Sequence, residues 1–288
     1  MNIGFVGLGI MGEPMCRNLL EKLGGTVYVF NRTKAKAAAL LAEGAVWCES
    51  AREAAERADV FLTMVPRTED SRAVYESVLP ALDATKLCID MSTIAPAASE
   101  AIAAMVKRTG AEFIDAPVVK SRPAAEAGTL GIYVGGSEAA YERALPVLRC
   151  LGSNILRLGG NGKGLVMKLC HNALVSQIQN GVNETSALAA AYGIDISTYA
   201  LAISYGGGQN AYLDTKKAPL AAEDYTTAFS VRNMHKDVHL CAELAVQAGL
   251  PMPGEENAVR VYDAAMAADL GDEDFCATVK VVRGEAGA

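Results

Sequence analysis

The sequence has no apolar run that approaches the roughly 20 residues a membrane-spanning helix needs. Its first residues, MNIGFVGLGIMGEPM, are apolar but lack the basic segment and the small-residue cleavage site of a secretory signal peptide. They are typical instead of a strand followed by a turn and a helix. We therefore expect a protein that stays in the cytoplasm.

Positive charge and paired cysteines are also scarce. The chain has 26 lysines and arginines against 33 aspartates and glutamates, a net charge of −7, which argues against a general nucleic-acid-binding protein. The seven cysteines form no CxxC pair, so zinc-binding and thioredoxin-like chemistry are not indicated. We expect buried, reduced cysteines and no metal site.

The first half of the chain alternates short apolar runs with helical segments. With 288 residues, of which 51% are hydrophobic, the chain is long enough for two domains with large cores. Strands are predicted at residues 2–6, 26–30, 60–65, 87–90, 112–114 and 131–134, and helices at 14–22 and 34–43. This alternation predicts a parallel sheet covered by helices on both faces.

A glycine-rich turn, GLGIMG, follows the first predicted strand and opens the first predicted helix. Gly7 would make the tight turn, Gly9 would let the backbone approach a pyrophosphate, and Gly12 would let the helix pack closely on the strand. Because strand and helix patterns flank this GxGxxG motif, it predicts a dinucleotide-binding Rossmann domain. The residues expected to line the cofactor here are Gly7, Leu8, Gly9, Ile10, Met11 and Gly12.

Strand patterns end near Gly164, and alanine-rich helical stretches run from there to the C-terminus. The first is a long apolar helix over residues 165–192, and glycines at 206–208 and prolines at 251 and 253 interrupt the later ones. We therefore predict an α/β Rossmann domain over residues 1–162 and an all-helical domain over residues 163–288, joined by a long interdomain helix at about 163–192. Asp272, Glu273 and Asp274 are expected to form a solvated turn.

Asn31, Arg32 and Thr33 follow the second predicted strand, where an NAD-dependent enzyme usually has an Asp or Glu that binds the ribose hydroxyls. An acidic residue would repel a 2′-phosphate, whereas Arg32 can pair with it through two hydrogen bonds. The pattern favours NADP(H). The alternative is NAD(H), with Arg32 as an ordinary solvated charge.

A polar stripe follows the long helix. Its members recur at spacings of four, four, three and four and share one face: Lys168, Asn172, Ser176, Gln179 and Asn183. One lysine and no carboxylate is an unusual composition for a solvent face, although an ordinary amphipathic helix is the alternative. A lysine among apolar residues loses hydration, which lowers its pKa and suits it to acid–base catalysis. Asn172, one turn on, can hydrogen-bond the same substrate.

Several motifs in this order resemble the β-hydroxyacid dehydrogenase family over nearly the whole chain. GFVGLGIMGEPM resembles the family's cofactor loop, MVP at residues 64–66 the segment that passes the adenosine, and DMST at 90–93 the segment beside the nicotinamide. DAPV at 115–118 and GTL at 128–130 resemble the substrate segment. GxGxxxKxxxN at 162–172 resembles the catalytic helix, and HKD at 235–237 the segment that closes over the site.

The resemblance implies an NAD(P)-dependent oxidoreductase that moves a hydride between nicotinamide and a small β-hydroxy acid or the matching semialdehyde. Lys168 would be the general acid–base residue, and Asn172 would orient the substrate. Further cofactor contacts would come from Val65, Pro66, Thr93 and Lys236, with Asp237 fixing Lys236. The Asn-Arg-Thr segment looks like that of NADPH-preferring members, and the family commonly forms homodimers or homotetramers through its helical half.

The chain departs from the family at Val119-Lys120-Ser121, where most members have Ser-Gly-Gly that binds the substrate carboxylate. Val119 and Lys120 are not expected to adopt the glycine geometry as readily, so the contact should pass to side chains. Sulfolactaldehyde reductase also has a basic residue and a hydroxyl here, so Lys120 and Ser121 point to a strong site for a sulfonate, a phosphonate or a second carboxylate. The alternative is that Lys120 points to solvent and Ser121 binds alone. A second departure, His171, is expected to be a packed, hydrogen-bonded residue rather than a proton relay.

Two other interpretations stay open. An imine reductase would share this architecture but usually lacks the catalytic lysine. A non-catalytic dinucleotide-binding regulatory protein would have no need of a lone lysine on a buried face. Lys168 and Asn172 favour an alcohol–carbonyl reaction over both, and NADPH oxidation with semialdehydes and cyclic imines would separate the three.

Overall fold

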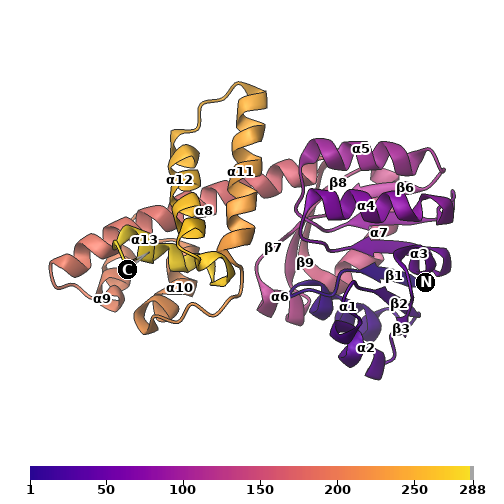
Figure 1. Ribbon diagram of the computed structural model, residues 1–288, viewed down its shortest axis with the longest axis horizontal. Helices are drawn as coiled ribbons and strands as arrows, with labels where there is room; N and C mark the ends of the chain where they lie inside the picture. The colour runs from indigo at the N-terminus through magenta and orange to yellow at the C-terminus, as the bar shows by residue number, and fades with distance from the viewer. Residues whose placement is uncertain (286–288) are drawn as a thin grey trace. The chain divides into compact units, whose positions relative to one another are not determined.

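The computed structural model describes residues 1–285, which fall into two compact units that divide after Lys168 (Figure 1). The first unit contains a nine-stranded sheet with helices, and the second is built of helices. The fold class predicted from the sequence, an α/β Rossmann domain followed by a helical domain, is therefore confirmed. The division lies inside the long helix α8 (Lys163–Ala191), whose first residues belong to the sheet unit.

Six parallel strands form most of the sheet, in the order β3-β2-β1-β4-β5-β6. Their bounds are β1 (Ile3–Val6), β2 (Val27–Phe30), β3 (Val46–Trp47), β4 (Val60–Thr63), β5 (Leu87–Asp90) and β6 (Glu112–Asp115). The strand order reverses at β1, because β2 lies on one side of it and β4 on the other. In open α/β sheets this point, at the carboxyl ends of the strands, is where ligands bind.

The far edge of the sheet departs from the parallel arrangement that the alternating pattern predicts. β8 (Leu130–Gly135) runs antiparallel to β6 and to β7 (Val118–Val119), and β9 (Gly152–Gly159) pairs with β8 in parallel. Only residues 120–129 join β7 to β8, fewer than the dozen or so that a parallel crossover needs. The expectation of a purely parallel sheet is wrong for this edge.

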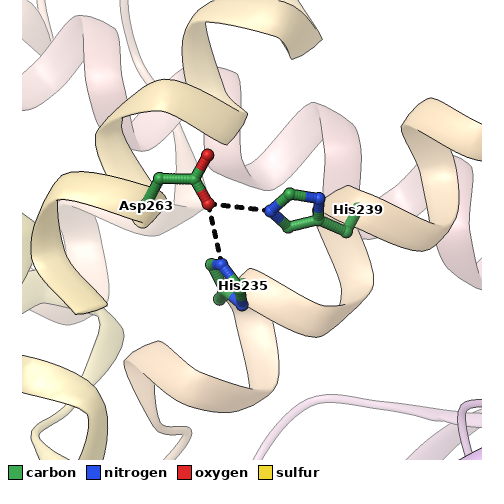
Figure 2. Close-up of side chains that lie close together, drawn as sticks. All are labelled: His235, His239 and Asp263. Carbon is green, nitrogen blue, oxygen red and sulfur yellow. Dashed lines mark hydrogen bonds and ion pairs between the residues drawn. The ribbon is translucent and has the colours of Figure 1, made fainter. Parts of the chain in front are cut away.

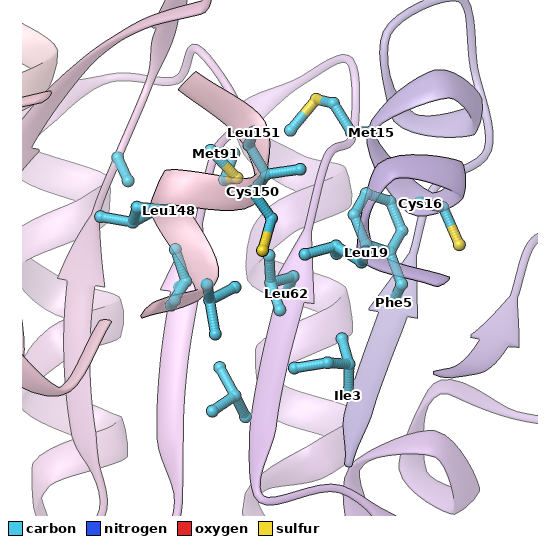
Figure 3. Packing of buried hydrophobic residues seen from close by; sticks show 14 of the residues in the cluster. Ile3, Phe5, Met15, Cys16, Leu19, Leu62, Met91, Leu148, Cys150 and Leu151 are labelled. Atoms are coloured by element: carbon cyan, nitrogen blue, oxygen red, sulfur yellow. The ribbon is translucent and has the colours of Figure 1, made fainter. Parts of the chain in front are cut away.

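Helices cover both faces of the sheet, as expected. One buried cluster joins the sheet to α1 (Gly12–Lys22), α2 (Ala38–Ala42), α6 (Arg122–Ala127) and α7 (Glu138–Leu151) (Figure 3). The other joins it to α3 (Ala51–Arg57), α4 (Thr68–Val78) and α5 (Pro96–Lys107). Because strand side chains alternate, Ile3 and Phe5 belong to the first cluster while Val6 belongs to the second.

The second unit contains most of α8 and five further helices. They are α9 (Ile196–Ile203), α10 (Ala211–Ala222), α11 (Val231–Ala248), α12 (Pro253–Ala267) and α13 (Val279–Val282). The glycines at 206–208 lie between α9 and α10, and Pro253 opens α12, where its missing N–H costs no helical hydrogen bond. Within residues 1–285, no helix combines the length and hydropathy that crossing a membrane requires.

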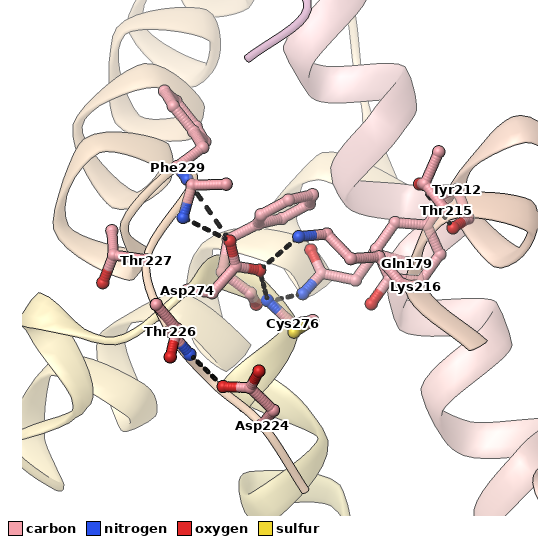
Figure 4. Close-up of polar contacts among 12 residues, drawn as sticks. Gln179, Tyr212, Thr215, Lys216, Asp224, Thr226, Thr227, Phe229, Asp274 and Cys276 are labelled. Carbon is pink, nitrogen blue, oxygen red and sulfur yellow. Dashed lines mark hydrogen bonds and ion pairs between the residues drawn. The ribbon is translucent and has the colours of Figure 1, made fainter. Parts of the chain in front are cut away.

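The expected solvated turn at residues 272–274 is wrong for its last member. Asp274 is 1% exposed and accepts hydrogen bonds from the Lys216 ammonium at 2.7 Å and from the backbone N–H groups of Ala228 and Cys276 at 3.1 Å each (Figure 4). A buried carboxylate needs such partners to offset its lost hydration. Lys216 and Ala228 lie 58 and 46 positions away in the chain, so the local sequence did not reveal these partners.

The cysteines are all free. Six are buried, as the composition predicts, whereas Cys170 on α8 is exposed, which was not expected.

Candidate active site

The glycine loop leaves the carboxyl end of β1 and leads into α1. Gly7 has a φ of +102°, and a Cβ on it would lie 2.2 Å from the carbonyl oxygen of Met64. A Cβ on Gly12 would lie 1.9 Å from the carbonyl oxygen of Gly7. Both are backbone oxygens that cannot swing aside, so the chain's own packing requires these two glycines.

Gly9 differs from both. It is exposed, and a Cβ on it would meet nothing within 4 Å. The chain therefore leaves space beside Gly9 that its own packing does not use. The N–H groups at the start of α1 lie next to it, since the N–H of Glu13 bonds to the carbonyl of Gly9. A helix N-terminus beside an open glycine is the arrangement that accepts a pyrophosphate, so these residues fit a dinucleotide.

Asn31 connects the glycine loop to the turn after β2. Its Oδ1 accepts the N–H of Leu8 at 3.0 Å, and its Nδ2 donates to the carbonyl of Thr33 at 2.9 Å. The side chain of Asn31 thus links the glycine loop to the turn at residues 31–33, the two segments expected to bind the cofactor. This contact was not foreseen from the sequence.

Arg32 lies at the carboxyl end of β2 with its side chain 73% exposed. Its Nη1 is 3.2 Å from Asp70, and Arg67 Nε is 3.1 Å from the other oxygen of the same carboxylate. Two guanidinium groups therefore converge on one acid. Exposed ion pairs contribute at most about 1 kcal/mol, so Asp70 does not prevent Arg32 from binding another anion.

A buried network joins the loops after β4 and β5, which carry Val65, Pro66 and Thr93. Asp90 accepts hydrogen bonds from Thr63 at 2.9 Å and Ser71 at 2.5 Å, while Ser92 Oγ accepts the N–H of Val65 at 2.9 Å. Burial raises the pKa of Asp90, and these hydrogen bonds oppose that rise. Sequence reasoning placed Asp90 in the segment beside the nicotinamide but assigned its side chain no role. The available signal was an acid as the last residue of an otherwise apolar strand.

Asp115 ends β6 and caps the first turn of α8. Its carboxylate accepts the N–H of Gly162 at 2.7 Å and of Leu165 at 3.1 Å, and burial raises its pKa to about 6. A Cβ on Gly164 would lie 2.8 Å from the same carboxylate and 2.5 Å from the carbonyl oxygen of Tyr133. Gly164 of the motif before Lys168 is thus a steric requirement of this close approach, whereas Gly162 has a φ of +86°. Sequence reasoning missed the capping role of Asp115.

Lys120 overturns one expectation about the substrate segment. Its φ is +75°, in the left-handed region that glycine adopts most readily, so the backbone here does take a glycine-like geometry. Its Nζ donates to the carbonyl of Thr129 at 2.7 Å, which uses one of the three ammonium donors. Ser121 follows in extended conformation at the N-cap position of α6 and is half-buried.

Lys168 and Asn172 lie four residues apart on α8 and are 7% and 4% exposed. The other members of the stripe are buried too, so the alternative of an ordinary solvent-facing stripe is wrong. Gln179 and Asn183 bond to the hydroxyl of Thr278 at 2.5 and 3.1 Å and thus have a structural role. Ser176 Oγ donates to the carbonyl of Ala173 at 2.8 Å, so Lys168 and Asn172 are the members of the stripe that stay candidates for contact with a substrate.

One carboxylate orders the candidate groups of the helical unit. Asp237 receives Lys236 Nζ at 2.6 Å on one oxygen and Asn172 Nδ2 at 2.6 Å on the other. The expected contact between Asp237 and Lys236 is present, and its extension to Asn172 was not foreseen. His171 is half-buried beside this face.

Comparisons with known proteins agree with this geometry. Residues 2–160 match the NAD-binding domain of 6-phosphogluconate dehydrogenase, and residues 162–282 match the NAD-binding region of NADP-dependent 3-hydroxyisobutyrate dehydrogenase. The chain is 33% identical to 2-(hydroxymethyl)glutarate dehydrogenase of Eubacterium barkeri, over 98% of this chain and 94% of that one. It is 34% identical to the mitochondrial 3-hydroxyisobutyrate dehydrogenase of Drosophila melanogaster, over 99% and 90% of the two chains.

A solved structure of similar form is 3-hydroxyisobutyrate dehydrogenase from Mycobacterium tuberculosis with L-serine. It has a TM-score of 0.90 and 33% identity, and the match covers 98% of this chain and 99% of that one. The chain is therefore an NAD(P)-binding oxidoreductase and belongs to the β-hydroxyacid dehydrogenase family.

Proposed function

We propose that this protein interconverts a small β-hydroxy acid and the matching semialdehyde, with Lys168 as the general acid–base residue. The observation that supports this most directly is the burial of Lys168 and Asn172 on one face of α8. A lysine on a buried helix face beside an amide can hydrogen-bond the oxygen of a substrate and exchange a proton with it, which is the chemistry that reduction of a carbonyl requires.

In the reducing direction the Nζ of Lys168 donates a proton to the carbonyl oxygen, which becomes the hydroxyl of the product. In the oxidising direction the neutral amine takes the hydroxyl proton. Asn172, held at its amide by Asp237, orients the reacting oxygen. The nicotinamide, when bound, supplies or accepts the hydride at the carbon. Asp115 positions Lys168 by capping the turn of α8 that precedes it.

We propose NADP(H) as the preferred cofactor, held by the glycine loop, Asn31 to Thr33, Val65, Pro66, Thr93 and Lys236. Arg32 would bind the 2′-phosphate, with Arg67 beside it on the shared Asp70. A charge-assisted hydrogen bond is worth about 1.5–3 kcal/mol, more than the exposed pair with Asp70 that it replaces.

Lys120 and Ser121 are proposed to bind the acidic group of the substrate. The left-handed backbone at Lys120 supports an anion contact like that of a glycine loop, and the ammonium adds a charge. A lysine is a point charge that suits a tetrahedral anion as well as a planar carboxylate. This favours a sulfonate, phosphonate or dicarboxylate semialdehyde over a neutral aldehyde.

We also propose that the protein is a homodimer or homotetramer that associates through its helical unit. Leu174, Leu188 and Leu201 are 60%, 61% and 57% exposed there, and contact between subunits would remove these large apolar side chains from water. Size-exclusion chromatography with light scattering measures the mass, and Leu188→Glu should lower it.

The proposed chemistry is tested by comparing Lys168→Ala with Lys163→Ala, an exposed lysine of the same helix. Lys168→Ala should lower kcat about 10²- to 10⁴-fold with cofactor affinity nearly unchanged, whereas Lys163→Ala should behave as wild type. The assay follows NADPH oxidation with carboxylate semialdehydes, sulfonate semialdehydes and cyclic imines. Turnover of imines alone, or wild-type kcat in Lys168→Ala with hydride transfer rate-limiting, would refute the proposal.

A further inference from the structure

Two histidines and an aspartate that the proposed reaction does not use converge on the packed pair of helices α11 and α12. His235 and His239 lie one turn apart on α11, and Asp263 faces them from α12 (Figure 2). The Nε2 atoms of both histidines lie 2.8 Å from the same oxygen, Oδ1 of Asp263. The ligand-capable atoms of the three side chains all lie within 4.8 Å of one another.

This convergence is more than a pair of ordinary surface contacts. The two imidazole rings are 4.4 Å apart, and both point their outer nitrogens at one atom. The hydrogen bonds of the histidines lower the pKa of Asp263 and so favour its carboxylate form, and each imidazole ring brings one further ligand-capable nitrogen.

The donor set and its spacing match a divalent transition ion. Two histidines at positions i and i+4 of a helix present their nitrogens on one face, which is the arrangement by which helical histidine pairs bind zinc. Imidazole and carboxylate are suitable zinc ligands, and two nitrogens with one oxygen leave a fourth position for water.

Only a small adjustment would admit the ion. Ligand atoms about 2.0–2.2 Å from a tetrahedral zinc lie roughly 3.3 Å apart, so each nitrogen would move about half an ångström from Asp263. The side chains of His235, His239 and Asp263 are 28%, 42% and 51% exposed, which leaves them room to move and lets the ion enter.

We infer that His235, His239 and Asp263 form a three-ligand site for a divalent transition metal of the zinc class, which joins α11 to α12. The sequence predicted no metal site. Asp263 lies 24 residues after His239 on another helix, so the spacing of the three residues did not reveal that they converge. The ion would restrain the turn of α11 that carries Lys236 and Asp237. Its direct effect is to stabilise the helical unit.

The test is titration of chelator-treated full-length protein with Zn²⁺ by isothermal calorimetry, with Co²⁺ as a spectroscopic probe. Wild type should bind one ion per chain, and its Tm should rise by about 5 °C or more at a free zinc concentration 100 times the Kd. His239→Gln and Asp263→Asn should each weaken binding by about 100-fold or more, since even partners behind the ligands change affinity 10- to 100-fold.

Two variants serve as controls. Glu184→Gln removes an exposed carboxylate of the same unit, and Cys170→Ser removes the exposed thiol, the chief competing zinc ligand. Both should bind as wild type, and bound Co²⁺ should lack a sulfur charge-transfer band. Circular dichroism without metal establishes that each ligand variant is folded. If one is not, the other ligand variant and the Co²⁺ spectrum decide the result.

The inference is overturned if zinc does not bind, or if it binds equally to His239→Gln and Asp263→Asn. It is also overturned if binding disappears in Cys170→Ser. None of these outcomes depends on catalysis, so they leave the proposed function unaffected.

Discussion

Gly9 and Gly12 belong to the same motif but should respond in opposite ways to the same substitution. At Gly12 an added Cβ lies 1.9 Å from a backbone oxygen, more than 1 Å inside the roughly 3.2 Å at which such atoms normally touch. At Gly9 an added Cβ touches nothing within 4 Å. The chain therefore needs Gly12 in order to fold, and we attribute the need for Gly9 to the cofactor.

The magnitudes follow from these contacts. Gly12→Ala should lower the free energy of unfolding by about 3 kcal/mol or more, because α1 must shift off β1 to relieve the overlap. Gly9→Ala should leave stability unchanged or raise it by about 0.4–1 kcal/mol, since it reduces the freedom of the unfolded chain. Gly9→Val should keep the fold but hold the pyrophosphate away from the helix N-terminus. Loss of one charge-assisted hydrogen bond would weaken NADPH binding about 10- to 150-fold.

Two measurements separate the effects: urea unfolding for stability and NADPH fluorescence titration for Kd. The expected pattern is a stable Gly9→Val with weak binding, and an unstable Gly12→Ala. Wild-type affinity in Gly9→Val would mean that the open space does not receive the pyrophosphate. Wild-type stability in Gly12→Ala would contradict the steric argument itself.

Three further substitutions test the proposed specificity and the electrostatics. Arg32→Glu should lower kcat/KM with NADPH about 10- to 150-fold and maintain or improve kcat/KM with NADH. The control Arg108→Glu, at an exposed position, should change neither value. An equal loss with both cofactors would indicate that Arg32 has a role in folding instead. Lys120→Ala should raise KM for anionic semialdehydes about 10- to 150-fold and leave KM for a neutral aldehyde unchanged. Lys120→Gly should have the same effect on KM and should also stabilise the fold by about 1 kcal/mol, because glycine adopts the left-handed backbone without strain. Equal effects on neutral and anionic substrates would contradict the anion-site proposal. Burial raises the pKa of Glu255 from 4.5 to about 7, so the stability that its protonated form contributes is complete below pH 4.5 and is lost as pH rises through 7. Between pH 5 and pH 8 the free energy of unfolding of Glu255→Gln should therefore rise by on the order of 2 kcal/mol relative to wild type, as measured by urea unfolding. The same pH dependence in both proteins would contradict this assignment.

The sequence predicted those helices and strands whose residues form a clear local pattern. The segment from Ile3 through Gly12 combines an apolar strand, a glycine turn and a helix start within ten residues, and β1 and α1 form there as expected. The two-residue strands β3 and β7 are too short to show a period, and β9 has a single buried residue and no alternation of buried and exposed positions. Pattern reasoning therefore missed all three.

The contacts that order the candidate site could not be predicted because they join distant residues. Asp115 bonds to Gly162, 47 positions away, and Asn172 bonds to Asp237, 65 positions away. Lys120 shows a different limit: its positive φ depends on how β7 enters α6, so residue type alone indicated the opposite. The stripe on α8 was recognised from its period, but the structure was needed to show that Gln179 and Asn183 bond to Thr278.

The capping of α8 by Asp115 decides where this chain can be cut. A fragment that ended at residue 160, where the first family match ends, would remove both N–H partners of Asp115 and the buried Leu165. It would leave a buried carboxylate unsatisfied, at a cost of about 1–3 kcal/mol or more. A nucleotide-binding fragment should therefore extend past Leu165 into α8, as the compact unit that ends at Lys168 does. A chimera that joined residues 1–168 of this chain to the helical unit of a relative would keep Lys168, the candidate proton donor, with the nucleotide-binding unit. Asn172 and Lys236 would both be replaced by residues of the relative.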